Sequence, residues 1–278
     1  MAKELEPHQK IERSIITKYR KALWNRFVYA VKRYELIQSG DRVAVCISGG
    51  KDSMLMAKLI QELRRHSDVP FGVEYLVMDP GYSEANRRKI ESNAALLHVP
   101  VTIFRSDIFA VANAADQNPC YLCARMRRGA LYSKAKELGC NKIALGHHFN
   151  DVIETTLIGM FWGSQLQAML PKLHSTNFEG MELIRPLYCV HEDDIIAWKR
   201  YNGLEFLQCA CRFTEENSHG AGNSKRQEIK LLLRSLKQDN PDIEKSIFNS
   251  IHAVCLDTMA GYKRKGKEYS FIDLFNGM

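Results

Sequence analysis

A short apolar run that ends in a glycine-rich turn constrains the fold of this chain more than any other feature. Residues 42–47 (RVAVCI) are mostly apolar, and residues 48–50 (SGG) follow them directly. A run of this kind is typical of a buried strand, and residues 54–65 continue with the apolar spacing of a helix. The order of strand, tight turn and helix predicts the first unit of a parallel sheet covered by helices.

The alternation of strands and helices continues downstream. Residues 71–79 (FGVEYLVMD), 101–104 and 142–146 (KIALG) have strand composition, and segments of helical spacing separate them. We predict these helices over residues 83–97, 120–138 and 150–161. The pattern is typical of an α/β protein with a doubly wound parallel sheet.

The pattern changes after Pro171, and helices dominate from there. At 278 residues the chain is long enough for one sizeable core with smaller appended elements. Residues 9–37, before the first strand, have the spacing of an amphipathic helix. After Pro171 we predict one short strand and three helices, at residues 182–187, 192–201, 225–238 and 242–260. We expect an N-terminal helical segment over residues 1–37, a nucleotide-binding domain over 38–190 and a helical C-terminal extension over 191–278.

Composition and charge indicate an ordinary globular protein with a polyanionic partner. Hydrophobic residues make up 45% and charged residues 26% of the chain, and the formal net charge is +7. A polyanion partner would explain the positive excess, although any single basic cluster can equally be a solvated helix face. No apolar run suits a membrane span and no signal peptide is recognisable, so we expect a cytoplasmic protein. The basic clusters are Arg87-Arg88-Lys89, Arg125 with Arg127 and Arg128, and Lys263-Arg264-Lys265 with Lys267.

Residues 48–53 (SGGKDS) are the strongest candidate for a phosphate-binding loop. The two glycines let a phosphate approach the backbone, and amides at the start of the following helix attract an anion. A lysine and two serine hydroxyls add further donors. The segment is not a Walker A loop, because Val45 and Asp52 stand where that pattern requires glycine and Ser or Thr.

Two close pairs of cysteines point to metal binding or sulfur chemistry. The chain has eight cysteines and no secretory signal, which argues against a disulfide framework. Cys120 and Cys123 form a CxxC pair at the predicted start of a helix, and Cys209 lies close to Cys211. A zinc site, a thioredoxin-like redox pair and an iron–sulfur cluster held by the first pair and one later cysteine all remain open. The tight spacing of the second pair disfavours zinc, and the CxxC lacks the strand context of thioredoxin.

The SGGKDS string resembles the PP-loop of the ATP pyrophosphatases, which split ATP between its α and β phosphates and adenylate a substrate oxygen. The resemblance implies that residues 48–53 hold pyrophosphate with the help of Mg²⁺. It also implies that the ends of the second and fourth strands line the same crevice around adenosine. The implied ATP-binding residues are Ser48, Gly49, Gly50, Lys51, Asp52, Ser53, Met78, Asp79, Gly146 and His147.

A longer resemblance runs from about Leu36 to the C-terminus and is specific to one branch of the PP-loop enzymes. Residues 119–163 (PCYLCARMRRGALYSKAKELGCNKIALGHHFNDVIETTLIGMFWG) are similar to the tRNA 2-thiocytidine synthetases, as are the strings MLPKL, IRPLYCV, HEDDI and AVCLDT. This implies a 4Fe–4S cluster with three cysteine ligands and a target cytidine at position 32 of tRNA. Alignment of LEFLQC favours Cys209 over Cys211 as the third ligand beside Cys120 and Cys123. The family usually has Pro-Cys-x-x-Cys-Gly at this point, whereas this chain has QCACR.

The resemblance implies an ATP-dependent sulfurtransferase, and our candidates for catalytic residues are Lys51, Asp52, Asp151 and Arg127. Arg127 would lie beside the cluster or the substrate, or else contact a phosphate. Lys51 and Mg²⁺ would neutralise the leaving pyrophosphate, and the basic clusters would hold the tRNA backbone. Asp151 would handle a proton or position the metal, or else it complements the dipole of its helix.

Other functions remain open at this point. A different base or acceptor would make the chain another PP-loop sulfur transferase, and loss of catalysis would make it a zinc-stabilised RNA-binding module. A PP-loop ligase without sulfur chemistry has no use for the CxxC pair. The sequence does not identify the sulfur donor, such as a cysteine desulfurase or sulfide, or say whether the chain forms a homodimer.

Overall fold

The computed structural model describes residues 4–106, 108, 119–207 and 224–276 of the chain. Two compact units make up the chain: Met1–Val152 with Met169–Asn223, and Ile153–Ala168 with Ser224–Met278. The first unit contains the whole of the larger sheet. No helix within the described ranges is long and apolar enough to cross a membrane.

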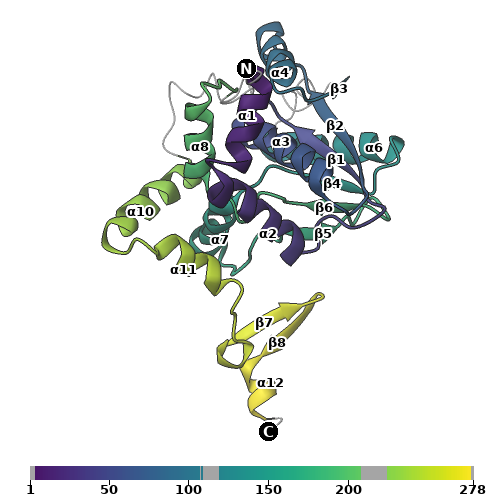
Figure 1. Cartoon of the computed structure of the whole chain (residues 1–278). Helices are drawn as coiled ribbons and strands as arrows, with labels where there is room; N and C mark the ends of the chain where they lie inside the picture. Colours follow the sequence, from purple (N-terminus) through teal and green to yellow (C-terminus); the bar gives the residue numbers. More distant parts are fainter. Residues whose placement is uncertain (1–3, 107, 109–118, 208–223, 277–278) are drawn as a thin grey trace. The chain divides into compact units, whose positions relative to one another are not determined.

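The first unit is built on a six-stranded sheet in the order β3-β2-β1-β4-β6-β5 (Figure 1). The strands are β1 Arg42–Ile47, β2 Gly72–Asp79, β3 Val101–Arg105, β4 Lys142–Ala144, β5 Lys172–His174 and β6 Glu182–Ile184. The pairings from β3 through β6 are parallel, and β5 pairs antiparallel with β6 at the edge. The predicted doubly wound parallel sheet is therefore confirmed. The sequence does not predict β5, because three residues are too few to show an alternating pattern.

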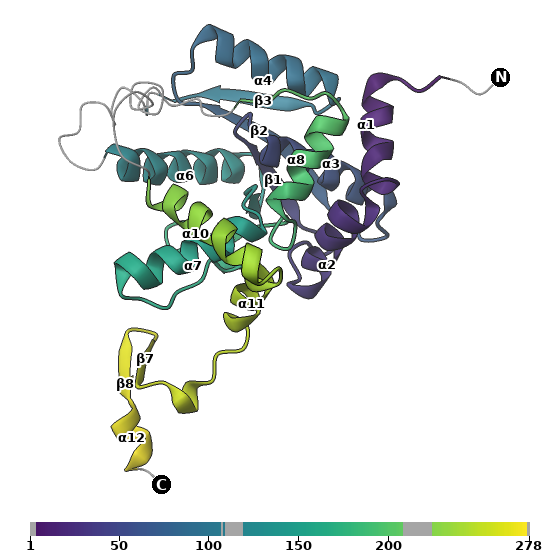
Figure 2. The same ribbon diagram turned by 90° about the vertical axis from the view of Figure 1, so that its left-hand side faces the viewer.

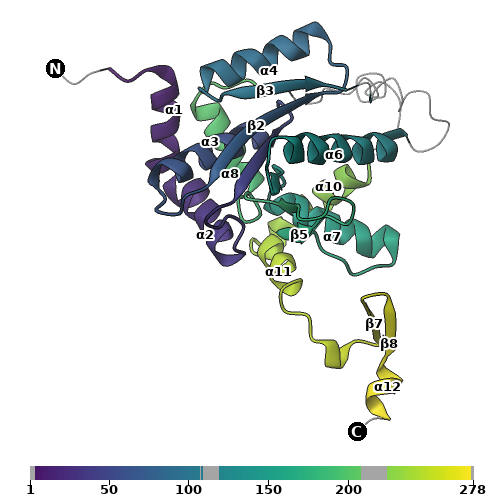
Figure 3. The ribbon, with the colours of Figure 1, turned by 90° about the vertical axis from the view of Figure 1, so that its right-hand side faces the viewer.

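Helices cover both faces of this sheet (Figures 2 and 3). α3 and α8 lie on one face and α6 lies on the other, and consecutive residues of β1 face opposite sides. Val45 joins the core that includes Trp198 of α8, whereas Cys46 joins the core that includes Tyr132 of α6. The helices between and after the strands are α3 Lys51–His66, α4 Glu84–Leu96, α6 Pro119–Glu137 and α8 Glu192–Tyr201.

The segment before β1 is helical, as predicted, but it is not continuous. Three pieces replace the single helix expected over residues 9–37: α1 Pro7–Ile16, the π-helical turn η1 Arg20–Trp24, and α2 Asn25–Arg33. The hydroxyl of Thr17 donates to the carbonyl of Arg13 at 2.7 Å, and the backbone of Thr17 leaves helical angles (φ −114°, ψ −85°). Such a local hydrogen bond competes with the helix and interrupts it here.

The second unit is mainly helical. α7 (Phe149–Gly163) enters it, and α10 (Lys225–Asp239) follows the predicted bounds within one residue. The next prediction is wrong in length, because α11 (Ile243–Ser250) ends well before residue 260. The Ser250 hydroxyl donates to the Ile247 carbonyl at 2.8 Å, so local side-chain bonding satisfies the final turn.

The basic run near the C-terminus lies on a hairpin that the sequence does not predict. β7 (Gly261–Arg264) and β8 (Lys267–Ser270) pair antiparallel, between η2 (Leu256–Thr258) and α12 (Phe271–Phe275). Lys265 and Gly266 form the turn with φ values of 51° and 78°. Two residues with positive φ are the requirement of a tight two-residue hairpin, so this charge cluster is a turn as well as a basic patch.

Candidate functional site

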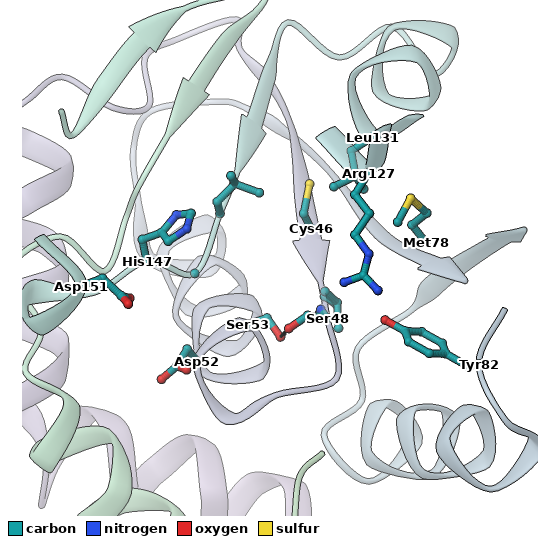
Figure 4. Close-up of a pocket in the computed structure, with 13 residues that line it drawn as sticks. Cys46, Ser48, Asp52, Ser53, Met78, Tyr82, Arg127, Leu131, His147 and Asp151 are labelled. Carbon is teal, nitrogen blue, oxygen red and sulfur yellow. Dashed lines mark hydrogen bonds between the residues drawn. The ribbon is translucent and has the colours of Figure 1, made fainter. Parts of the chain in front are cut away.

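A cavity of about 310 Å³ opens at the carboxyl edge of the sheet, where β1 and β4 are neighbours. The chain leaves β1 towards β2 on one side and leaves β4 towards β6 on the other. In a doubly wound sheet this divergence opens a crevice at which ligands bind. Figure 4 shows the side chains around it. The lining residues are Cys46, Ile47, Ser48, Asp52, Ser53, Met78, Tyr82, Arg127, Leu131, Leu145, Gly146, His147 and Asp151.

The loop between β1 and α3 is held by its own serines. The Ser53 hydroxyl accepts from the Ser48 backbone N–H at 3.1 Å and donates to the Gly50 carbonyl at 3.0 Å. Gly49 has a φ of +85°, and a Cβ at this position would lie 2.7 Å from Ile90. Only glycine fits such a backbone position without strain. The loop therefore presents amides and hydroxyls in a fixed arrangement at the start of α3, which suits a phosphate.

Gly146 brings the end of β4 against the start of α3. A Cβ on Gly146 would lie 3.1 Å from the Ser53 nitrogen and 3.3 Å from the carbonyl carbon of Asp52. These are backbone atoms, so a side chain here would push the two loops apart. The sequence places Gly146 in the crevice, and the structure gives it the specific role of close backbone approach.

Lys51 is held between two carboxylates. Its ammonium lies 3.1 Å from Asp52 Oδ2 and 3.0 Å from Oε1 of Glu192, the first residue of α8. Burial alone lowers the pKa of Lys51, but the two carboxylates outweigh burial and raise that pKa above its ordinary value. Lys51 is therefore fully charged at neutral pH.

His148 and Asp151 connect this cluster to α7. The His148 side chain is almost completely buried, and its Nδ1 accepts from the Asp151 backbone N–H at 3.3 Å. In a neutral imidazole this leaves the proton on Nε2, which lies 3.9 Å from both Asp52 Oδ1 and Glu192 Oε1. Asp151 Oδ2 accepts from the His148 backbone N–H at 3.0 Å. Asp151 thus combines a helix-terminal position with a place in the cavity wall.

Residues of α6 and of the loop after β2 form the facing wall. In Figure 4, Arg127 reaches from α6 towards Ser48 and the Tyr82 hydroxyl, and Met78 lies beside it. Met78 lines the cavity as expected, and His147 lines it from the end of β4. The sequence does not single out Tyr82, because its place depends on how the turn after β2 folds.

Asp79 lies at the end of β2 but is not among the lining residues. Its Oδ1 accepts from the backbone N–H groups of Gly81 at 3.0 Å and Tyr82 at 2.8 Å. Its Oδ2 lies 3.7 Å from Arg87. Asp79 therefore shapes the turn that brings Tyr82 to the cavity.

A second hollow, of about 490 Å³, lies on the other side of the same loop. Lys51 faces it together with Lys199 and Arg200 of α8, two cations that the sequence patterns do not mark. Leu207 closes one side, and its backbone N–H donates to the Gly49 carbonyl at 3.1 Å. The chain that follows α8 is thereby fixed to the phosphate-binding loop.

The cysteine predictions fall at the limit of the described residues. Cys120 and Cys123 are the second and fifth residues of α6, and their side chains are outside the described part, as is the whole of Cys209. Within the described part, no group of three or more His, Cys, Asp or Glu side chains could hold a metal ion. Cys46 and Cys140 are core residues, and burial raises the pKa of Cys46 to about 12.

Known proteins are similar to this chain in sequence and in fold. Residues 15–214 match the family described as "PP-loop domain". The tRNA-cytidine(32) 2-sulfurtransferase of Citrifermentans bemidjiense is 35% identical over 235 residues, which cover 83% of this chain and 89% of that protein. The protein of the same description from Cellvibrio japonicus is 34% identical over 253 residues, covering 89% and 80%. Among solved structures, the U34-tRNA thiolase NcsA from Methanococcus maripaludis with its 4Fe–4S cluster aligns with a TM-score of 0.65 at 20% identity. That alignment covers 86% of this chain and 80% of NcsA, and it supports the fold alone.

Proposed function

The chain belongs to the PP-loop domain family and, within it, to the family of the tRNA-cytidine(32) 2-sulfurtransferases, and from this premise we propose that it thiolates tRNA at the expense of ATP. The base oxygen attacks the α-phosphorus, and pyrophosphate leaves. Sulfur then attacks C2 of the adenylated base, and AMP departs with the oxygen. The most specific form of the proposal is 2-thiocytidine at position 32, the base and position that the relatives' descriptions name.

One observation carries the proposal: the helix that bears the CxxC pair also forms a wall of the nucleotide cavity. Arg127 and Leu131 of α6 line that cavity. At 100° per residue, the positions of Cys120 and Cys123 fall with these two within an arc of about 80°. The CxxC pair and the cavity-lining residues therefore share one side of α6.

We propose Cys209, which follows Leu207 by two residues, as the third ligand, as the alignment of LEFLQC implies. Leu207 is hydrogen-bonded to Gly49 of the phosphate-binding loop. Leu207 is the last described residue before both candidate cysteines, and the alignment favours Cys209 over Cys211.

The cysteine donor set fits an iron–sulfur cluster in this chain. Three thiolates, from Cys120, Cys123 and Cys209, are a recognised ligand chemistry for such a group. When bound, the cluster supplies an iron without a protein ligand, at which sulfide can be held for transfer. The chain's own contribution would be Cys120 and Cys123, on the helix whose Arg127 and Leu131 line the nucleotide cavity.

The loop residues and the carboxylates have distinct parts in the first step. Residues 48–53 would hold the phosphates, and Lys51 would neutralise charge on the leaving pyrophosphate. Asp52 Oδ1 is buried and accepts no hydrogen bond from the described residues. A magnesium ion bound by one or two carboxylates and by ATP phosphates would satisfy it. We assign Asp52 and Asp151 to that ion, and Arg127 to the substrate or its phosphates.

The test is mass spectrometry of nucleosides from the tRNA of a host that lacks this gene. We expect 2-thiocytidine to be absent and to return when the wild-type chain is supplied. Cys120→Ser should not restore it, because the donor set would be incomplete. Cys140→Ala is the matched control, since Cys140 packs in the core behind α6 and should restore the nucleoside.

Two other results would change the proposal. If 2-thiocytidine is unaffected and a different thionucleoside disappears, the reaction stands and the base is wrong. If no thionucleoside changes, tRNA is not the sulfur acceptor. Where a thionucleoside does depend on the chain, supplying sulfide or a cysteine desulfurase to the purified protein with ATP and tRNA would identify the donor.

A further inference from the structure

A separate hollow of about 780 Å³ lies against a different face of α6. Arg127 and Leu131 face the nucleotide cavity, whereas Arg125, Arg128 and Tyr132 face this hollow. The opposite side of the hollow is made by β5, the start of the β5–β6 connection, and Arg185 just after β6. α6 therefore separates two cavities, and only the first is assigned to ATP.

The lining of this hollow is strongly positive. It includes Arg125, Arg128 and Arg185, and it includes no aspartate or glutamate; its one histidine, His174, lies 3.5 Å from Glu182 Oε1. Among the described residues, none of the three arginines has an ion pair. The apolar part of the wall, where Tyr132 and Phe178 stack with ring centroids 5.0 Å apart, leaves these charges poorly screened.

Arg185 is the clearest indication that this hollow suits an anion. The residue is only 8% exposed, and one guanidinium nitrogen donates to the Leu170 carbonyl. Its Nε is buried and has no hydrogen-bond partner among the described residues. Burial, followed by the nearby charge of Arg128, lowers the pKa of Arg185 to about 10. A buried guanidinium beside a second cation is costly unless an anion joins them.

We propose that this hollow binds a backbone phosphate of the RNA substrate, with Arg125 and Arg128 at the exposed rim and Arg185 at the buried end. The inference rests on the proposed function, because that function supplies the RNA. Arginine forms paired hydrogen bonds with phosphate oxygens, and most protein contacts to nucleic acid are made to the backbone. An exposed rim with a buried cation behind it suits a phosphate that remains attached to a long chain.

The position of the hollow suits an RNA whose target base enters the nucleotide cavity. Arg185 directly follows Ile184, whose carbonyl accepts from the backbone N–H of Leu145 at 3.0 Å. Leu145 lines the nucleotide cavity. The two sites are thus neighbours along the carboxyl edge of the sheet. A phosphate held by Arg185 would anchor the RNA backbone while a flipped base reaches the adenylation site.

The experiment measures binding of an unmodified tRNA transcript by fluorescence anisotropy over a series of KCl concentrations. Arg128→Gln is the main variant, because Arg128 is exposed and its loss should not disturb folding. We expect its affinity for tRNA to fall about tenfold. The slope of log K against log salt should become shallower by about one, as for the loss of one phosphate contact. Binding of ATP alone should not change.

Two further variants test the shape of the cation in the hollow and the loss of an arginine outside it. Arg185→Lys keeps the charge but loses the forked geometry, so it should weaken tRNA binding with little change in the salt slope. Arg64→Gln is the matched control: Arg64 is exposed in the last turn of α3, at the amino edge of the sheet, and has no ion pair among the described residues. It should leave both the affinity and the slope close to those of the wild type.

Three results would overturn the inference. If Arg128→Gln behaves like Arg64→Gln, the hollow does not bind RNA, although wild-type binding still supports the proposed function. If the Arg128 and Arg185 variants weaken binding of inorganic phosphate but not of tRNA, the hollow holds a free anion. If the wild-type chain binds no tRNA, the proposed function fails and this inference fails with it.

Discussion

α3 carries two lysines, about two helical turns apart, whose surroundings differ in a way that separates function from folding. Lys58 is completely buried, whereas the Lys51 side chain is 22% exposed and faces a hollow. Burial dominates at Lys58 and lowers its pKa. At Lys51 burial also acts to lower the pKa, but the two adjacent carboxylates outweigh it and raise the pKa. The same residue type on one helix thus meets opposite electrostatic conditions.

The hydrogen bonds of the two lysines explain the difference. The Lys58 ammonium uses all three of its donors, on Glu12 at 2.5 Å, Gln61 at 2.7 Å and the Leu97 carbonyl at 2.8 Å. The Lys51 ammonium makes two hydrogen bonds to described residues. Lys58 therefore has a complete set of hydrogen bonds within the fold, which suits a structural role. Lys51 makes fewer hydrogen bonds to described residues and keeps its charge at a hollow, which suits ligand binding.

Replacing Lys51 should have the largest effect, and the effect should be on catalysis. In Lys51→Met we expect formation of 2-thiocytidine in vitro to slow by about 10²–10³-fold, because the charge opposite the leaving pyrophosphate is lost. The free energy of unfolding should change by about 1 kcal/mol or less, since the pair is partly exposed. Single-turnover assays and urea unfolding of one preparation give both quantities. A rate within tenfold of the wild type would contradict the assignment.

Replacing Lys58 should reverse the pattern. In Lys58→Met we expect unfolding to become easier by about 3 kcal/mol, because the Glu12 side chain, only 12% exposed, keeps Arg65 as its remaining cation, 3.0 Å away. The thiolation rate per folded molecule should match that of the wild type. Urea unfolding measures the first quantity, and an assay corrected for the folded fraction measures the second. A stable variant with a lost rate would show that the two networks do not differ in role.

The comparison also shows what the sequence can and cannot predict. Local patterns are sufficient for β1 and for α8, whose predicted and observed bounds agree, because strand composition and helical spacing act over a few residues. The SGGKDS string likewise identifies the loop. No local pattern indicates that Glu192 reaches Lys51, or that Arg185 is buried beside Arg128, because those contacts exist only after the sheet has formed. The C-terminal hairpin escapes prediction because its strands are short and charged.

The smallest expected effect is a change in acid stability at the Lys58 network. Glu12 has a pKa lowered below its ordinary 4.5: burial alone would raise that pKa, but Lys58 and Arg65 outweigh burial. The stabilisation that ionised Glu12 gives the folded state is therefore complete above about pH 4.5, and it is lost as the pH falls through the lowered pKa of the folded state. In Glu12→Gln we expect a loss of about 1 kcal/mol at pH 7 that shrinks towards zero at low pH. Urea unfolding at pH 7, 5 and 3 would check it. A loss that is the same at all three values would mean that Glu12 acts by packing and not by charge.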